Sequence, residues 1–172
     1  MRPTVVELAV LVALAGVGYW WWSRPIAQGE FDGNPERFFV TPVDEFPDVE
    51  QFHRRGKVLM LDADNRLVDP MQDYLPDEVR ARTPEEVGTV GLVRCQESLS
   101  GYYIPFLVKG FNHSCQVQLI ALPSLRMIAN TGTALSPPTR VRLPFWNRHA
   151  QRPTKHLATT IAEMPDLGRE PQ

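Results

Sequence analysis

The apolar residues of this chain are concentrated in an N-terminal run, which is followed by a more polar remainder. From Val5 to Trp22 the only charged residue is Glu7. A helix of that length spans about 27 Å, close to the roughly 30 Å hydrocarbon thickness of a bilayer. The run ends in an aromatic cluster at residues 19–22, which is typical of a membrane–water interface. The pattern predicts a transmembrane segment at residues 1–23.

We interpret this segment as an uncleaved signal anchor of a single-pass membrane protein. A signal-peptidase site needs small residues just after the apolar core, whereas tryptophans and residues 23–25 (Ser-Arg-Pro) follow it here. The alternatives are a signal peptide cleaved late, near residues 27–29, and a buried soluble helix. Two positive charges, Arg2 and the α-amine, precede the apolar run, and one, Arg24, follows it. Because the more positive flank tends to stay in the cytoplasm, the sequence favours a cytoplasmic N-terminus and an extracytoplasmic globular part.

Residues 24–56 are predicted to form a juxtamembrane stalk, because glycines and prolines punctuate them. The spacing of Phe46, Val49 and Phe52 predicts one short helix there. Three further phenylalanines argue against free disorder, and we expect them to dock onto the domain that follows: Phe31, Phe38 and Phe39.

A buried strand is predicted at residues 57–61, followed by a polar turn at 62–65 and a short returning strand at 66–68. Prolines allow only short helical turns from 70 to 88. The best of these begins at Thr83, which can cap it, with Glu86 completing a capping box.

Turn signals about every ten residues then predict an antiparallel meander with strands at 89–97, 102–108, 111–122 and 125–129. The expected turns lie at 98–101, 109–110, 123–124 and 130–132. Strand alternation places Val93 with Cys95 on one face, and on the next long strand it groups Cys115, Val117, Leu119 and Ala121.

One helix closes the chain. Pro153 suits its first turn, and Leu157, Ile161 and Met164 follow helical spacing. We therefore predict an α+β domain over residues 57–165, in which an antiparallel meander sheet of five or six strands is packed by the C-terminal helix. Residues 166–172 are expected to fray.

Charge is distributed unevenly along the 172 residues, although the net charge is only -2. That total excludes a strongly basic nucleic-acid binder, and no nucleic acid is expected as a partner. Residues 26–90 carry 15 acidic and 7 basic side chains, whereas no Asp or Glu occurs from Ser98 to Ala162.

The carboxylate-free stretch contains the best candidate binding surface, because it mixes cations with an aromatic ring in a Pro-rich region. Such a surface would bind an anionic lipid headgroup, an acidic glycan or an acidic protein segment. The alternative is that these cations pair with the acidic region of the same domain. The candidate residues are Arg140, Arg142, Trp146, Arg148, Arg152 and Lys155.

The strand and turn at residues 58–67 resemble the opening motif of haloacid-dehalogenase-like phosphatases, with Asp62 and Asp64 at the spacing of that family. Asn65 and Arg66 stand where the family has Gly and Thr, and the chain is too short for a doubly wound fold. An EF-hand loop also fails, because Arg66 replaces an oxygen ligand and Leu67 a glycine. A polar hairpin turn is the preferred interpretation, and a loose cation site at Asp62, Asp64 and Asp69 is a minor alternative.

Cys95 and Cys115 are predicted to lie on apolar strand faces, so two core thiols are the first interpretation. A disulfide would fit an extracytoplasmic domain. A meander, however, places a strand between them, about 9–10 Å apart, while a disulfide needs Cα atoms within about 7 Å. A metal site with His113 lacks a fourth ligand, so neither a metal nor a cofactor is predicted.

No hydrolase, dinucleotide or phosphate-loop signature occurs in the sequence, so no catalytic residue is assigned. We expect a membrane-anchored, non-enzymatic protein whose extramembrane domain is a binding or assembly module. The alternatives are a hydrolase-type enzyme using scattered carboxylates (Asp62, Asp64 and Asp69) and an accessory subunit of a membrane complex.

Overall fold

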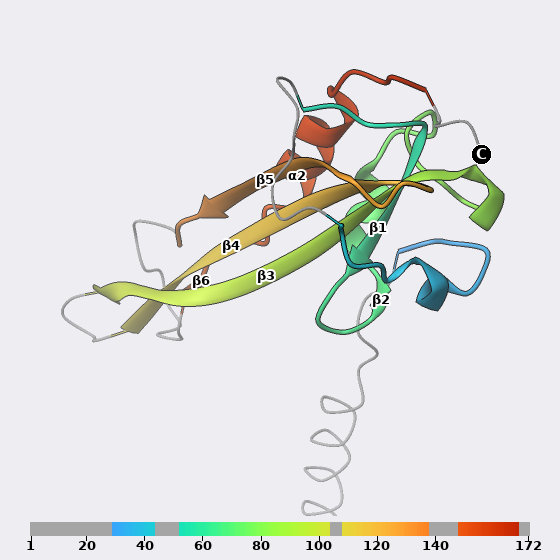
Figure 1. The fold of residues 1–172 in the computed structure, drawn as a ribbon. Coiled ribbons are helices and arrows are strands. Elements are labelled where there is room, and N and C mark those ends of the chain that lie inside the picture. The colour runs from blue at the N-terminus through green and yellow to red at the C-terminus, as the bar shows by residue number, and fades with distance from the viewer. Residues whose placement is uncertain (1–28, 44–51, 104–107, 138–147, 169–172) are drawn as a thin grey trace, which may run out of the picture.

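A computed structural model describes residues 29–43, 52–103, 108–137 and 148–168. In these ranges the chain forms an α+β domain built on a mixed sheet with one C-terminal helix (Figure 1). Five strands follow the order β2-β1-β3-β4-β5, and a short β6 pairs with β4. The expected transmembrane segment lies outside the described residues, as do Phe46 and Val49 of the expected stalk helix.

The strands are β1 (Lys57–Asp62), β2 (Leu67–Val68), β3 (Val87–Tyr103), β4 (Val108–Ala121), β5 (Met127–Leu135) and β6 (Arg148–His149). Within the described ranges the α-helix is α2 (Thr154–Ala162). Three 3-10 turns connect these elements: η1 (Pro35–Phe38), η2 (Pro70–Tyr74) and η3 (Pro84–Glu86).

The sheet is mixed rather than purely antiparallel, which corrects the sequence-based prediction. The predicted hairpin of β1 and β2 is present, but β1 runs parallel to β3. The reason is the segment from η2 to η3, which brings the chain back to the start of β1. Two backbone hydrogen bonds join this segment to Val58 of β1. The Val58 N–H donates to the Val79 carbonyl, and the Val58 carbonyl accepts from the Ala81 N–H.

The predicted turns at 98–101, 109–110 and 130–132 are also wrong, because β3, β4 and β5 respectively include these residues. β3 therefore replaces the two expected strands at 89–97 and 102–108, and it pairs with β4 from Thr89 to Tyr103. Ser and Gly residues are turn formers, but here they lie within β3. The pairing with β4 shifts register between Leu99 and Gly101 and continues beyond them.

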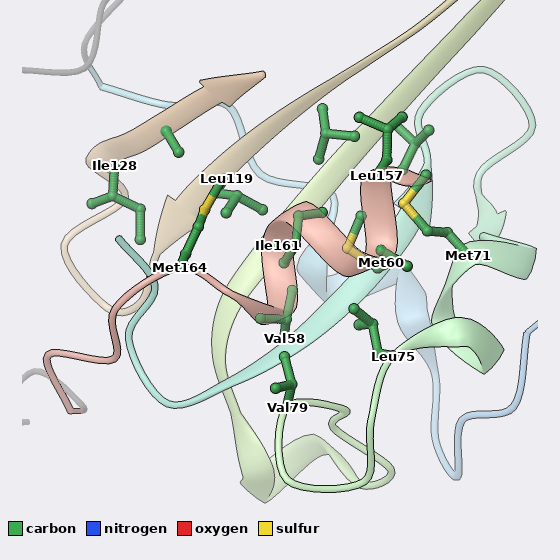
Figure 2. Packing of buried hydrophobic residues seen from close by; sticks show 14 of the residues in the cluster. Val58, Met60, Met71, Leu75, Val79, Leu119, Ile128, Leu157, Ile161 and Met164 are labelled. Carbon is green, nitrogen blue, oxygen red and sulfur yellow. The ribbon is translucent and has the colours of Figure 1, made fainter. Parts of the chain in front are cut away.

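The main core lies between the sheet and α2 (Figure 2). The predicted face of β4, from Cys115 to Ala121 in alternate positions, is buried there. Leu157, Ile161 and Met164 of α2 pack against it, as their spacing predicts. Full burial of one such aliphatic side chain contributes about 1.5–3 kcal/mol.

A second core lies on the opposite face of the sheet and includes Leu59, Leu61 and Ile120. Phe38 of η1 is buried in it, and Phe31 and Phe39 pack at its margin. The expectation that these phenylalanines dock onto the domain is confirmed. A backbone hydrogen bond also joins the segment before η1 to the edge strand β2, because the Gly29 N–H donates to the Val68 carbonyl over 3.1 Å.

The residues after α2 are joined to those before β1. Asp166 accepts hydrogen bonds from the Gly56 N–H at 2.9 Å and from the Arg54 guanidinium at 2.6 Å. Burial alone would raise the pKa of Asp166. The two bonds just described, a third hydrogen bond from the Gly168 N–H and the positive charge of Arg54 together lower this pKa overall. Residues 52–56 and 166–168 are thus part of the packed domain.

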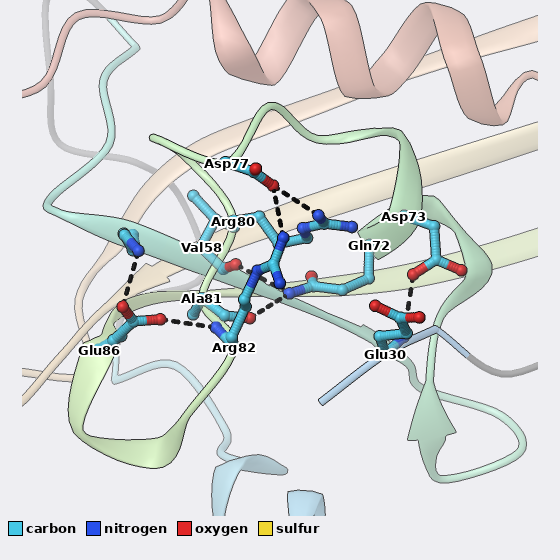
Figure 3. A network of polar contacts seen from close by, with 10 residues as sticks. Glu30, Val58, Gln72, Asp73, Asp77, Arg80, Ala81, Arg82 and Glu86 are labelled. Atoms are coloured by element: carbon cyan, nitrogen blue, oxygen red, sulfur yellow. Dashed lines mark hydrogen bonds and ion pairs between the residues drawn. The ribbon is translucent and has the colours of Figure 1, made fainter. Parts of the chain in front are cut away.

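A buried side-chain amide connects β1 to the segment that follows η2 (Figure 3). Gln72 is fully buried; its Oε1 accepts from the Met60 N–H at 2.8 Å, and its Nε2 donates to the Ala81 carbonyl at 2.6 Å. One amide therefore satisfies two buried backbone groups that no water can reach.

The variant Gln72→Leu should lower the free energy of unfolding by roughly 1–3 kcal/mol, because it leaves two buried backbone groups unpaired. Urea unfolding followed by circular dichroism measures the change. The exposed Gln96→Leu is the matched control, and we expect it to stay within about 0.5 kcal/mol of wild type. Equal effects of the two variants would contradict a structural role for the Gln72 amide.

Glu86 joins η3 to β1. Its carboxylate accepts from Lys57 Nζ at 2.7 Å and from the Arg82 N–H at 2.8 Å. The Lys57 hydrogen bond is the largest cause that lowers the pKa of Glu86 to about 2. Thr83 precedes η3 as predicted, but its side chain makes no capping hydrogen bond.

Because the pKa of Glu86 is lower in the folded state, its stabilising contribution is present above about pH 4.5 and is lost as the pH falls toward 2. The variant Glu86→Gln should therefore lose less stability than wild type between pH 6 and pH 3. Urea midpoints at the two pH values test this. Lys57→Gln should change the pH dependence in the same direction, and an unchanged pH dependence in Glu86→Gln would refute the assignment.

Candidate binding groove and disulfide cluster

The structure describes only part of the predicted set of basic residues. Arg140, Arg142 and Trp146 lie outside the described residues, and of Arg148 only its place in β6 is described. Lys155 is exposed on α2. The remaining candidate, Arg152, points into the domain instead.

Arg152 forms an ion pair with Asp69, with Nη2 donating to Oδ2. The Asp69 side chain is fully buried and also caps η2 by accepting from the Met71 N–H at 2.8 Å. Burial raises the pKa of the Asp69 carboxyl, and the adjacent guanidinium offsets only part of that rise. For Arg152 the alternative interpretation therefore holds: this cation pairs with the acidic part of its own domain.

Arg152 also contacts sulfur, because its Nε donates to Cys95 Sγ at 3.2 Å. Cys95 and Cys115 form a disulfide and lie directly opposite each other in the β3–β4 ladder, with Cα atoms 4.1 Å apart. The intervening strand expected between them does not exist, since β3 runs on through the predicted turn. Cys115 is buried at 3% exposure, whereas Cys95 is only partly buried.

A row of polar groups continues from the disulfide along the β3–β4 hairpin. Glu97 lies opposite His113 in the ladder, with its Oε1 3.8 Å from His113 Nδ1. The same carboxylate lies 3.0 Å from Nδ1 of His149 in β6. The His149 ring stacks on Phe111, with centroids 4.7 Å apart. Through these contacts β6 is held against the hairpin.

The ligand atoms of Cys95, His113 and Cys115 all lie within 4.8 Å of one another, a grouping compatible with a metal ion. The two sulfurs are bonded to each other, however, so neither is a free thiolate, the form that binds metals. The guanidinium of Arg152 beside Cys95 also disfavours a cation.

The carboxylates of the hydrolase alternative serve the structure. Asp62 accepts from the backbone N–H groups of Asp64 and Asn65 at 3.0 and 2.9 Å, so it closes the predicted polar hairpin turn. Burial raises the pKa of Asp62, but the hydrogen bonds from Asn65 and Asp64, together with the charge of Arg152, lower it overall. Asp69 is held by Arg152, which leaves Asp64 as the exposed member.

A groove of about 840 Å³ lies across β3, β4 and β5. Because Cys95 and Cys115 face α2, alternation directs the neighbouring side chains of β3 and β4 to the other face of the sheet. The side chains that line the groove include amide, hydroxyl and guanidinium groups, with Gln116 Nε2 donating to Asn130 Oδ1 at 2.9 Å. Its polar lining includes Asp64, Arg94, Gln96, Ser114, Gln116 and Asn130.

Sequence reasoning missed this groove, although the strand alternation that identified the apolar face of β4 contained a signal for it. The positions between the apolar ones, such as Gln116 and Gln118, are polar on a strand that is central in the sheet. Polar residues on a central strand indicate that one face is left open to solvent or to a partner.

No protein-family model matches the chain, and neither a curated protein nor a solved structure shows significant similarity to it. In the part of the chain that the structure describes, no helix is long and apolar enough to cross a membrane.

Removal of Arg152 should destabilise the domain because it leaves Asp69 buried without a counter-charge. We expect Arg152→Met to lower the free energy of unfolding by roughly 3 kcal/mol, the low end for buried pairs, since the Arg152 side chain is 25% exposed. Urea unfolding at pH 7 measures the loss.

The double variant Asp69→Asn/Arg152→Met should recover part of that loss, because no unpaired charge is then buried. Lys155→Met, at an exposed position of the same helix, is the control and should lie within about 0.5 kcal/mol of wild type. A double variant no more stable than Arg152→Met would show that charge pairing is not what Arg152 contributes.

Proposed function

We propose that this chain is a non-enzymatic binding or assembly module held beside a membrane by its N-terminal segment, from Val5 to Trp22. The observation that carries the proposal is the polar groove across β3, β4 and β5. A central sheet face with an open, hydrogen-bonding surface suits recognition of a partner better than it suits a buried core.

The chemistry of the groove favours an extended polypeptide segment of a partner protein. Side-chain amides such as Gln96, Gln116 and Asn130 each offer both donors and an acceptor, which match the alternating N–H and C=O groups of an extended main chain. Arg94 adds donors for carbonyl or carboxylate groups, and Asp64 supplies an acceptor at the groove margin.

The placement beside a membrane rests on the length of the apolar run and its aromatic end. An extracytoplasmic position of the domain is supported by the disulfide, because such bonds persist mainly in oxidising compartments. The basic residues Arg140, Arg142 and Arg148 would then face acidic protein segments or anionic headgroups at the same membrane, as their composition predicts.

The proposal can be tested by photocrosslinking of the full-length chain in membranes of its native host. A photoreactive phenylalanine derivative replaces the exposed Gln96 in the groove or, as a control, the exposed Glu163 after α2. We expect a discrete protein adduct from position 96 only. The adduct should be lost when Arg94→Glu and Gln116→Glu are added, because these charges remove donors from the groove.

Identical adducts from both positions, or an adduct that survives the two groove substitutions, would count against the groove as the binding surface. An adduct whose mass identifies a lipid or a glycan would replace the polypeptide partner with one of those classes. Recovery of the chain lacking residues 1–23 in the membrane-integral fraction would contradict the anchor.

A further inference from the structure

We propose that the Cys95–Cys115 disulfide is redox-active and oxidises a pair of thiols on a partner protein, with Cys95 as the sulfur that reacts. This inference goes beyond the proposed binding function, and it adds a stoichiometric exchange in which each protein molecule oxidises one dithiol and is itself reduced. It rests on the environment of the two sulfurs, which differ in access and in the charge beside them.

The two sulfurs are unequal in access. Cys115 is 3% exposed and belongs to the core beneath α2, whereas Cys95 is partly buried at the margin of the same core. Of the two residues, Cys95 is therefore the more accessible to a thiolate of another protein. This is the arrangement of an exchanging pair in which one cysteine meets the partner and the other stays inside.

The two sulfurs are also unequal in their electrostatic surroundings. Arg152 Nε donates to Cys95 Sγ at 3.2 Å, and the guanidinium is held in place by its second bond, to the buried Asp69. A cation beside a sulfur stabilises the thiolate and lowers the thiol pKa. His113 is the other titratable group at the sulfurs, and Glu97 faces it from β3.

The reaction balances as two exchanges. A partner thiolate attacks Cys95 Sγ, a mixed disulfide forms, and the Cys95–Cys115 bond breaks to release Cys115 as a thiolate that takes up a proton. The second partner thiol then loses its proton, and its thiolate attacks the partner's first sulfur in the mixed disulfide. This releases Cys95 as a thiolate beside Arg152. The partner dithiol becomes a disulfide, and the two electrons stay on Cys95 and Cys115. Exchange is faster when the leaving thiol has a low pKa.

Reduction does not require the fold to open. On both sides of the cysteines the ladder is paired without help from the disulfide, at Arg94 with Gln116 and at Gln96 with Ser114. The two reduced thiols would therefore remain opposite each other in the ladder.

The test uses the full-length chain in detergent micelles and, as the probe, a synthetic peptide containing two reduced cysteines. We expect the peptide to become oxidised in step with loss of the protein disulfide. In the reduced protein, mapping of iodoacetamide labelling by mass spectrometry should show Cys95 labelled before Cys115, with an apparent pKa below the usual value of about 8.5 for a thiol.

The contribution of Arg152 is tested in the background Asp69→Asn, where no buried carboxylate is left unpaired. Adding Arg152→Gln should raise the apparent pKa of Cys95. Labelling of Cys95 at pH 6 should slow by about threefold. The thiolate fraction becomes about tenfold smaller, but a thiolate of higher pKa is more nucleophilic and offsets part of that loss. Lys155→Gln is the control on the same helix and should label as wild type does.

Failure of the peptide to reduce the protein disulfide, labelling of Cys115 first, or a Cys95 pKa unchanged by Arg152→Gln would each overturn the proposal and leave the disulfide as a structural bond. A thermal melt of each variant shows that it is folded at the assay temperature. Cys95 and Cys115 also line the groove, but the crosslinking experiment substitutes neither of them and detects a bound partner rather than the redox state of the disulfide, so the two proposals can fail independently.

Discussion

The continuous pairing of β3 with β4 is the constraint on which the rest of the structure depends. Over its first part, from Thr89 to Val93, this ladder lies in the middle of the sheet, with β1 on one side and β5 on the other. Both faces of that part are buried, one by α2 and the other by the segment around η1. Beyond Val93 the same ladder extends past the end of β1 and projects from the body of the domain (Figure 1).

The two faces of the β3–β4 ladder carry side chains of different chemistry. Odd positions such as Cys95 and Cys115 face α2, where a buried carboxylate, a guanidinium and a disulfide are in direct contact. The alternate positions, Arg94 and Gln116 among them, form the polar groove on the other face. Because side chains alternate along a strand, neighbouring residues of one short segment serve two separate surfaces. A one-residue change in register would exchange the two sets.

The uneven charge distribution of the sequence has one clear structural result, the pair of Asp69 and Arg152. Asp69 comes from the acidic first half and Arg152 from the stretch that lacks carboxylates, and they are 83 positions apart in the chain. Nothing local in the sequence indicates which cation will be buried, so Arg152 cannot be told apart from the exposed basic residues near it. The disulfide is not predictable from the sequence because a turn at 98–101 would separate the two cysteines by a strand.

The elements that can be predicted from the sequence are those with a periodic signal. These are the buried strand β1 and its polar turn, the apolar face of β4, and the core face of α2. Three features emerge only in the folded chain: β1 pairs with β3 in parallel, β3 and β5 continue through Ser- and Gly-containing segments, and Cys95 lies opposite Cys115. The physical reason is that alternation and helical spacing depend on neighbours a few residues away. Strand order and register depend on which distant segments share backbone hydrogen bonds, and a Gly or Ser residue is compatible with either a turn or an irregular strand.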